Sequence, residues 1–75
     1  MTLDSVAFDV PVRVLGYAAL AAFDKDRLAG LGLRPGATVV KIMKTPLRDP
    51  VECLVGTQLL AIEARILPHI RVEAE

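Results

Sequence analysis

Few side chains of this sequence are suited to metal or cofactor chemistry. Cys53 and His69 are the only thiol and the only imidazole among its 75 residues. A structural zinc site usually takes four Cys or His ligands from closely spaced pairs, whereas these two lie 16 positions apart. Asp49 and Glu52 add carboxylates near Cys53, but no spacing groups them into a site. We therefore expect no cofactor and no metal site, and Cys53 and His69 are the candidate ligands if a metal does bind.

Both candidate ligands also have a structural interpretation. Cys53 alternates with Val51 and Val55, which on a strand places all three on one face. We expect it to be a small core residue, since free cysteines are among the most buried residue types. His69 follows Pro68 at the start of a predicted strand, and we expect its ring to be solvated.

No group of residues indicates catalysis. Ser5 is the single serine and has no neighbouring histidine. Gly30, Gly32 and Gly36 are not followed by the Lys-Ser or Lys-Thr pair of a phosphate-binding loop. Acidic residues at 24 and 26 stand at a predicted helix start, where they suit capping. We expect a protein that is not an enzyme.

Composition excludes further classes. Nine basic and nine acidic residues give a net charge of zero, which argues against a nucleic-acid partner because phosphates require basic charge. The longest uncharged runs, 14–23 and 53–62, hold ten residues each, half of the about 20 that span a bilayer. A single Cys fits a reducing compartment. We expect a cytoplasmic protein with no direct membrane insertion.

Length limits the core. A chain of 75 residues forms one domain at most, 1–75, and buries only about 60% of its unfolded surface. The apolar content of 53% compensates in part, and a homo-oligomer is a possible supplement.

Alternation and turn residues predict a mainly β fold. The expected strands are 10–15, 37–44, 51–55, 58–62 and 69–73, with one short helix between the first and second. Residues 3–6 are expected to form a turn over one end of the core, and 63–67 a helical turn before Pro68. Strands this short, with this turn punctuation, are typical of a small barrel.

Helix and turn signals surround the second strand. Asp24 suits a helix N-cap, with Phe23 and Leu28 at the spacing of a hydrophobic staple. Gly32 can end the helix in a left-handed conformation that folds Leu33 back onto Leu28. Arg34-Pro35-Gly36-Ala37 fits a type II turn, and Gly56-Thr57 a type II′ hairpin. Apolar residues on both faces of 37–44 suggest a bulge or strong curvature.

Two segments are candidates for binding a partner. Leu47, Arg48 and Asp49 lie at the tip of a loop bounded by Pro46 and Pro50, which is a contact surface if it is not simply a solvated turn. The run YAALAA at 17–22 either extends the helix backward or forms a loop packed on the core. Any part of it left exposed, with Tyr17 and Leu20 as its largest members, would be an apolar patch.

The sequence resembles the FeoA family, ferrous iron transport protein A. The matching residues are the block Leu28-x-x-Leu31-Gly32-Leu33-x-Pro35-Gly36, then Pro46-Leu47-x-Asp49-Pro50, and then Gly56, Leu59, Ala61, Ile62, Ile70 and Val72. The resemblance implies an SH3-like barrel. It also implies a cytoplasmic adaptor of the FeoB-type ferrous iron permease, docking on the permease's cytoplasmic, GTPase-containing part. Arg48 departs from the family's frequent glycine, and 17–22 is more apolar than usual.

The alternative is a regulatory module. The same barrel occurs as the C-terminal domain of iron-dependent repressors of the diphtheria toxin repressor type. A detached, metal-responsive SH3-like module is therefore the second hypothesis, although no helix-turn-helix precedes it in this sequence.

Overall fold

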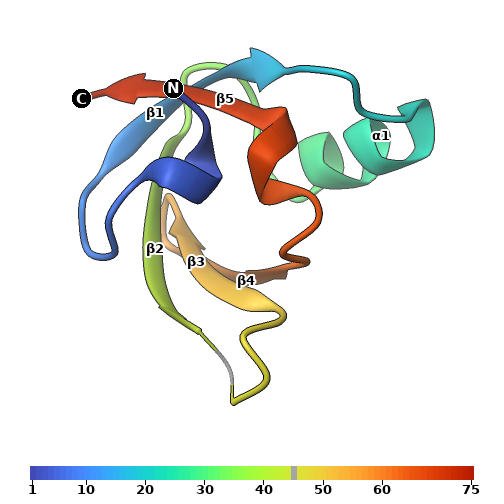
Figure 1. The fold of residues 1–75 in the computed structure, drawn as a ribbon. Helices are drawn as coiled ribbons and strands as arrows, with labels where there is room; N and C mark the ends of the chain where they lie inside the picture. Colours follow the sequence, from blue (N-terminus) through green and yellow to red (C-terminus); the bar gives the residue numbers. More distant parts are fainter. Residues whose placement is uncertain (45) are drawn as a thin grey trace.

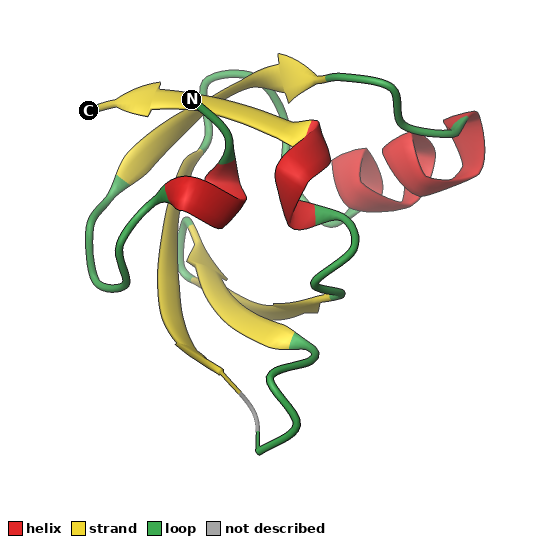
Figure 2. Cartoon of the chain, viewed as in Figure 1, coloured by secondary structure: helices red, strands yellow, loops and turns green. Residues whose placement is uncertain are grey.

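The structure is a computed structural model that describes residues 1–44 and 46–75, with only the backbone described for Lys44. The described residues form five strands and one α-helix, with two single-turn 3-10 helices (Figures 1 and 2). The strands are β1 (Val12–Tyr17), β2 (Thr38–Lys44), β3 (Val51–Val55), β4 (Gln58–Ile62) and β5 (Ile70–Ala74). The helices are α1 (Ala22–Gly30), η1 (Leu3–Ser5) and η2 (Leu67–His69).

The strands form one antiparallel sheet in the order β4-β3-β2-β1-β5. The sheet curls strongly, and η1 and η2 pack against each other on its concave side (Figure 1). The helix α1 lies between β1 and β2 in the chain and projects at one end of the molecule. The predicted mainly β fold, with five strands and a helix between the first and second, is confirmed.

The core lies inside the curled sheet. Strand alternation fills it as predicted: Val51, Cys53 and Val55 are buried along β3, with Cys53 fully inaccessible. The turn at η1 closes one end with a fully buried Leu3. The remaining buried apolar side chains are Val6, Val12, Val14, Leu28, Leu33, Val39, Leu60, Ile62, Ile66, Leu67, Ile70 and Val72.

The first strand lies two residues later than predicted. It runs from Val12 to Tyr17, and Val10 is an exposed loop residue. Gly16 does not end the strand, because a register irregularity between Val14 and Gly16 keeps it paired with β5. The bulge absorbs one extra residue and bends the strand, an effect that local alternation does not show.

The predicted start of α1 is wrong. The helix begins at Ala22, and its N-cap residue is Ala21, which makes no side-chain cap bond. Asp24 lies inside the first turn, where its carboxylate pairs with arginine side chains instead of capping. Phe23 is 79% exposed, so it does not staple onto Leu28. The 17–22 run therefore contributes only its last residue to the helix.

The end of α1 is as predicted. Gly32 has φ 94, in the region that favours glycine. The N–H of Gly32 donates to the Ala29 carbonyl and that of Leu33 to the Leu28 carbonyl, each at 3.0 Å. These are the two bonds of a Schellman motif, and both Leu28 and Leu33 are fully buried.

The two predicted glycine turns, one before β2 and one between β3 and β4, are also confirmed. The N–H of Ala37 donates to the Arg34 carbonyl at 2.9 Å around Gly36, which has φ 93. Gly56 has φ 60 at the tip of the β3–β4 hairpin. The predicted irregularity in β2 lies between Lys41 and Met43.

The connection from β4 to β5 differs from the prediction. The 3-10 helix η2 runs from Leu67 to His69 and includes Pro68 in its first turn, where a missing N–H costs no helix bond. The helical turn expected at 63–67 thus continues past the proline, and β5 begins at Ile70 instead of His69. Its alternation is as predicted, with Ile70 and Val72 buried and Arg71 exposed.

Candidate functional site

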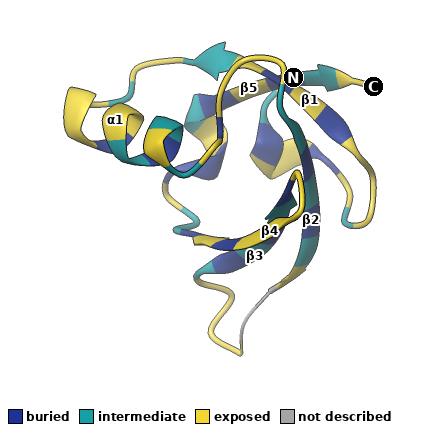
Figure 3. Ribbon diagram, turned by 180° about the vertical axis from the view of Figure 1, so that it is seen from behind, coloured by how far each residue is buried: buried dark blue, intermediate teal, exposed yellow. Residues whose placement is uncertain are grey.

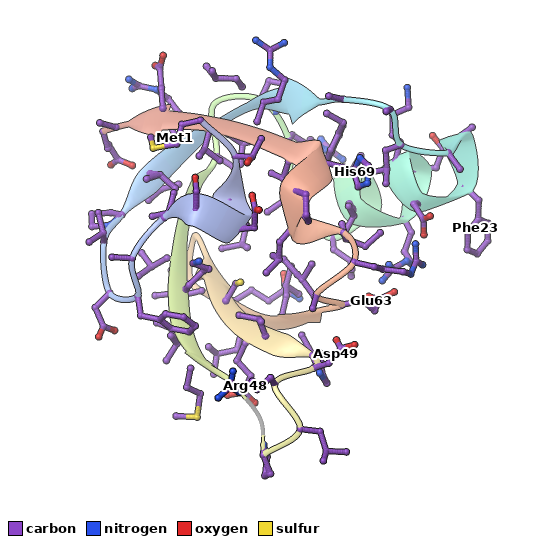
Figure 4. All side chains as sticks on the ribbon, in the orientation of Figure 1. Met1, Phe23, Arg48, Asp49, Glu63 and His69 are labelled. Carbon is purple, nitrogen blue, oxygen red and sulfur yellow. The ribbon has the colours of Figure 1, made fainter. Side chains whose placement is uncertain are left out.

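The loop between β2 and β3 presents the three residues predicted to bind a partner. Leu47 is 88% exposed, and Arg48 and Asp49 are exposed beside it. The loop extends from the end of the sheet, with Arg48 and Asp49 near its base in Figure 4. Thr45, within the same predicted loop, lies outside the described residues. Leu47 is therefore a large apolar side chain that is exposed to solvent.

The base of this loop is tied to the barrel. The Ala64 N–H, just after β4, donates to Asp49 Oδ1 at 2.8 Å. Asp49 is exposed, but its side chain also ties the loop to Ala64, which lies 15 positions later in the chain. Arg48 has φ 63, a conformation that costs most residues but not glycine about 1–2 kcal/mol. This backbone favours glycine, so Arg48 adopts a conformation that a glycine would take without that cost.

In the second predicted binding surface, residues 17–22, the two large side chains pack against the core. Tyr17 ends β1, is half-buried against the core, and donates its hydroxyl hydrogen bond to the Leu33 carbonyl. Burial raises the pKa of Tyr17, and the charge of Arg34 opposes that rise. Leu20 is also half-buried against the core. Neither alternative left open for 17–22 describes the whole run: Tyr17 ends β1, Ala22 begins α1, and in the loop between them only Leu20 packs on the core.

The structure does not bring these two surfaces together. The 17–22 connection leads into α1 at one side of the molecule, and the 46–50 loop projects from another (Figure 1). Side chains that remain exposed at 17–22 are alanines at 18, 19, 21 and 22. The 46–50 loop is thus the stronger candidate for a docking surface.

The two candidate metal ligands have separate structural roles. Cys53 is fully buried, and burial raises the pKa of its thiol to about 11 against the weaker opposing charge of Lys41. The His69 ring is half-buried, with Nδ1 2.8 Å from the Ala18 carbonyl, so it is more constrained than predicted. Within residues 1–44 and 46–75, no group of three or more His, Cys, Asp or Glu side chains could hold a metal ion.

Sequence reasoning missed an ion-pair cluster between α1 and the segment after β4. Asp24 pairs with Arg65 at 3.3 Å, and Arg27 pairs with Glu63 at 2.9 Å. The hydrogen bond from Arg65 holds the pKa of Asp24 below its usual value, and the same bond raises the pKa of Arg65. The only local signal was the i, i+3 spacing of Asp24 and Arg27.

It also missed a buried cation. Lys41, on β2, is only 4% exposed. Its Nζ lies 3.3 Å from the Asp4 carbonyl and 5.0 Å from the centre of the Phe8 ring. The lysine thereby links β2 to the N-terminal segment, a structural use that alternation alone would not predict.

These features define a small SH3-like barrel with an exposed apolar loop. The FeoA domain family matches residues 1–74, so the chain belongs to the FeoA family. The family consists of non-enzymatic accessory proteins associated with ferrous iron transport. No curated protein matches the sequence. None of the helices among the described residues is long and apolar enough to cross a membrane.

Solved structures agree with the family. FeoA of Chlorobium tepidum is 27% identical with a TM-score of 0.90, over 99% of this chain and 70% of that one. Iron(II) transport protein A of Clostridium thermocellum is 27% identical with a TM-score of 0.84, over 99% of this chain, which spans 45% of that protein's chain. FeoA of Stenotrophomonas maltophilia, solved with zinc, is 26% identical with a TM-score of 0.80 over 97% and 89% of the two chains. That protein is described as a prokaryotic SH3 domain protein, and the predicted SH3-like fold is confirmed.

Proposed function

We propose that this protein is a cytoplasmic adaptor of ferrous iron uptake that docks on the cytoplasmic, GTPase-containing part of a FeoB-type permease. The observation that carries the proposal is Leu47, which is 88% exposed in a loop tied to the barrel through Asp49. Membership of the FeoA family supports the transport context. The Stenotrophomonas maltophilia relative is itself described as a candidate ferrous iron transport activating factor.

Docking through Leu47 is favourable on physical grounds. Burying one leucine side chain in an apolar pocket of a partner contributes about 1.5–3 kcal/mol. The bond from the Ala64 N–H to Asp49 restrains the loop before binding, so less conformational freedom is lost on association. Arg48, exposed beside Leu47, adds a charge that can orient the encounter.

Paired substitutions test the docking surface. Leu47→Ala should weaken binding to the purified cytoplasmic domain of the permease by about tenfold or more, which corresponds to about 1.4 kcal/mol. Phe23→Ala is the matched control, because Phe23 is also a large exposed apolar residue, 79% accessible on α1. Titration calorimetry with and without guanine nucleotide measures both. Equal effects of the two substitutions, or no binding of the unmodified chain at tens of micromolar, would contradict the proposal.

A second substitution separates the charge of Arg48 from its backbone. Asn tolerates the left-handed conformation that Arg48 adopts at φ 63. Arg48→Asn should therefore keep the loop shape and remove only the guanidinium. A slower association rate that becomes less salt-dependent would show that the charge guides docking. An association rate unchanged in low salt would show that Arg48 has only a conformational role.

A further inference from the structure

The two edges of the sheet are protected differently. At the β5 edge, the Val72 N–H donates to the Met1 carbonyl at 2.9 Å and Arg71 forms a bridge with Thr2. The β5 strand also carries the charged residues Arg71 and Glu73. Natural sheets use both devices, coverage and charge, to prevent unwanted pairing at an edge. The β5 edge is therefore closed to further strands along this stretch.

The β4 edge has neither protection. Only β3 pairs with β4 among the described strands, and the sequence of β4, QLLAI, contains no charge and no proline. Leu59 is 64% exposed and Ala61 is also exposed. The exposed and buried positions of β4 can be followed in Figure 3.

The register shows which backbone groups face outward. Val55 and Gln58 flank the two-residue turn and are opposite each other, so they form a hydrogen-bonded pair. Because such pairs alternate along an antiparallel ladder, Leu60 also bonds to β3, whereas Leu59 and Ala61 point their N–H and C=O groups away from it. Within the described residues, the backbone groups of Leu59 and Ala61 make no hydrogen bond outside the ladder.

We infer that β4 pairs with β4 of a second copy of this chain, antiparallel about a two-fold axis at Leu60. In this register, Leu59 lies opposite Ala61 of the second copy, and Ala61 lies opposite Leu59 of that copy. These are the residues whose backbone groups point outward, so each opposed pair exchanges both of its N–H···O=C bonds. The two copies would then share one continuous sheet.

Side chains favour a second copy over an unrelated strand. Each interface pair places a large Leu59 beside a small Ala61, so the pattern is self-complementary, as a two-fold interface requires. The absence of charge in β4 removes like-charge repulsion between identical strands. On the same face Leu59 is opposite Leu54, which is opposite Val40, and pairing extends this apolar row into the second copy. The inference does not depend on docking through Leu47.

Two charge variants test the register. Leu59→Lys with Ala61→Lys places like charges opposite each other in both pairs, and should weaken self-association by about tenfold or more. Leu59→Glu with Ala61→Lys places opposite charges in both pairs, and should associate at least as well as the unmodified chain. Phe23→Lys, which adds a charge at an exposed apolar site on α1, is the control and should not change association.

Sedimentation equilibrium from about 10 μM to about 1 mM measures these constants. Amide hydrogen exchange locates the contact: protection of the Leu59 and Ala61 amides should rise with concentration, while the Leu60 amide is protected throughout. A chain that stays monomeric to about 1 mM would overturn the inference. So would equal association of the two charge variants, or protection that does not change with concentration.

Discussion

Asp24 and Arg65 face each other across 41 positions of the chain. Both carboxylate oxygens of Asp24 accept hydrogen bonds from the guanidinium of Arg65 at 3.3 Å. A second pair, Arg27 with Glu63, joins the same two segments at 2.9 Å. Together these contacts tie α1 to the chain that follows β4, while the start of the helix has no side-chain cap.

Substitution of Asp24 should change the acid stability of the protein. The folded-state pKa of Asp24 is lowered, first by its hydrogen bond from Arg65. Its contribution is therefore complete above the ordinary pKa of 3.8 and is lost as the pH falls through the lower folded-state pKa. Asp24→Asn should be less stable than the unmodified chain at neutral pH, and the difference should close in acid. Urea unfolding between about pH 7 and about pH 2 measures it.

A double-mutant cycle provides the control. If the two side chains act as a pair, Arg65→Gln should cost less in the Asp24→Asn background than in the unmodified chain. Additive effects of the two substitutions would contradict the pairing. A stability difference that persists unchanged to about pH 2 would contradict the role of the Asp24 charge.

Two glycines near the end of α1 should respond to alanine with opposite signs. Gly30 is the last residue of α1 and is not among the positive-φ glycines, so Gly30→Ala should stabilise by about 0.4–1 kcal/mol. Gly32 has φ 94, so Gly32→Ala should destabilise by about 1–2 kcal/mol through backbone strain. An added Cβ meets no atom within 4 Å at either position, so clashes do not confuse the comparison. Urea midpoints measure both, and a shared sign would show that the Schellman geometry does not limit stability.

The Cys53 thiol should be unreactive in the folded protein. Burial raises its pKa to about 11 from 9.0, which lowers the thiolate fraction near pH 8 about a hundredfold. Iodoacetamide should therefore modify Cys53 at least about a hundredfold more slowly in buffer than in concentrated urea. Mass spectrometry of quenched samples follows the reaction. Similar rates in the two solvents would mean that the β3 face is open to solvent.

Local signals predicted the parts of the fold that depend on a few neighbouring residues. Gly32, Gly36 and Gly56 adopt positive φ where the turn types required it. Cys53 is buried because alternation along a strand assigns its face. These features follow from sterics and side-chain direction within one turn or one strand, which the order of residues specifies.

Features that depend on distant neighbours were missed or wrongly assigned. The cap expected at Asp24 is absent because the helix begins two residues earlier, at Ala22. The Asp24 carboxylate bonds instead to Arg65, 41 positions later. Tyr17 was a candidate for an apolar binding patch if left exposed, but it is half-buried, and its hydroxyl donates to the Leu33 carbonyl just beyond the end of α1. The loop residues Leu47 and Arg48 were predicted to be exposed and are, while the docking role assigned to them stays a prediction.

The sequence alone determined the strand faces and the turn positions, because each is encoded by residues close together in the chain. Matching residues spread from Leu28 to Val72 also indicated the FeoA family. Only the tertiary structure decided which edge of the sheet is left open. The Met1–Thr2 segment covers β5 through its bonds to Val72 and Arg71, whereas no described strand but β3 pairs with β4. Edge protection is a relation between segments far apart in the chain, so no local pattern of residues could have specified it.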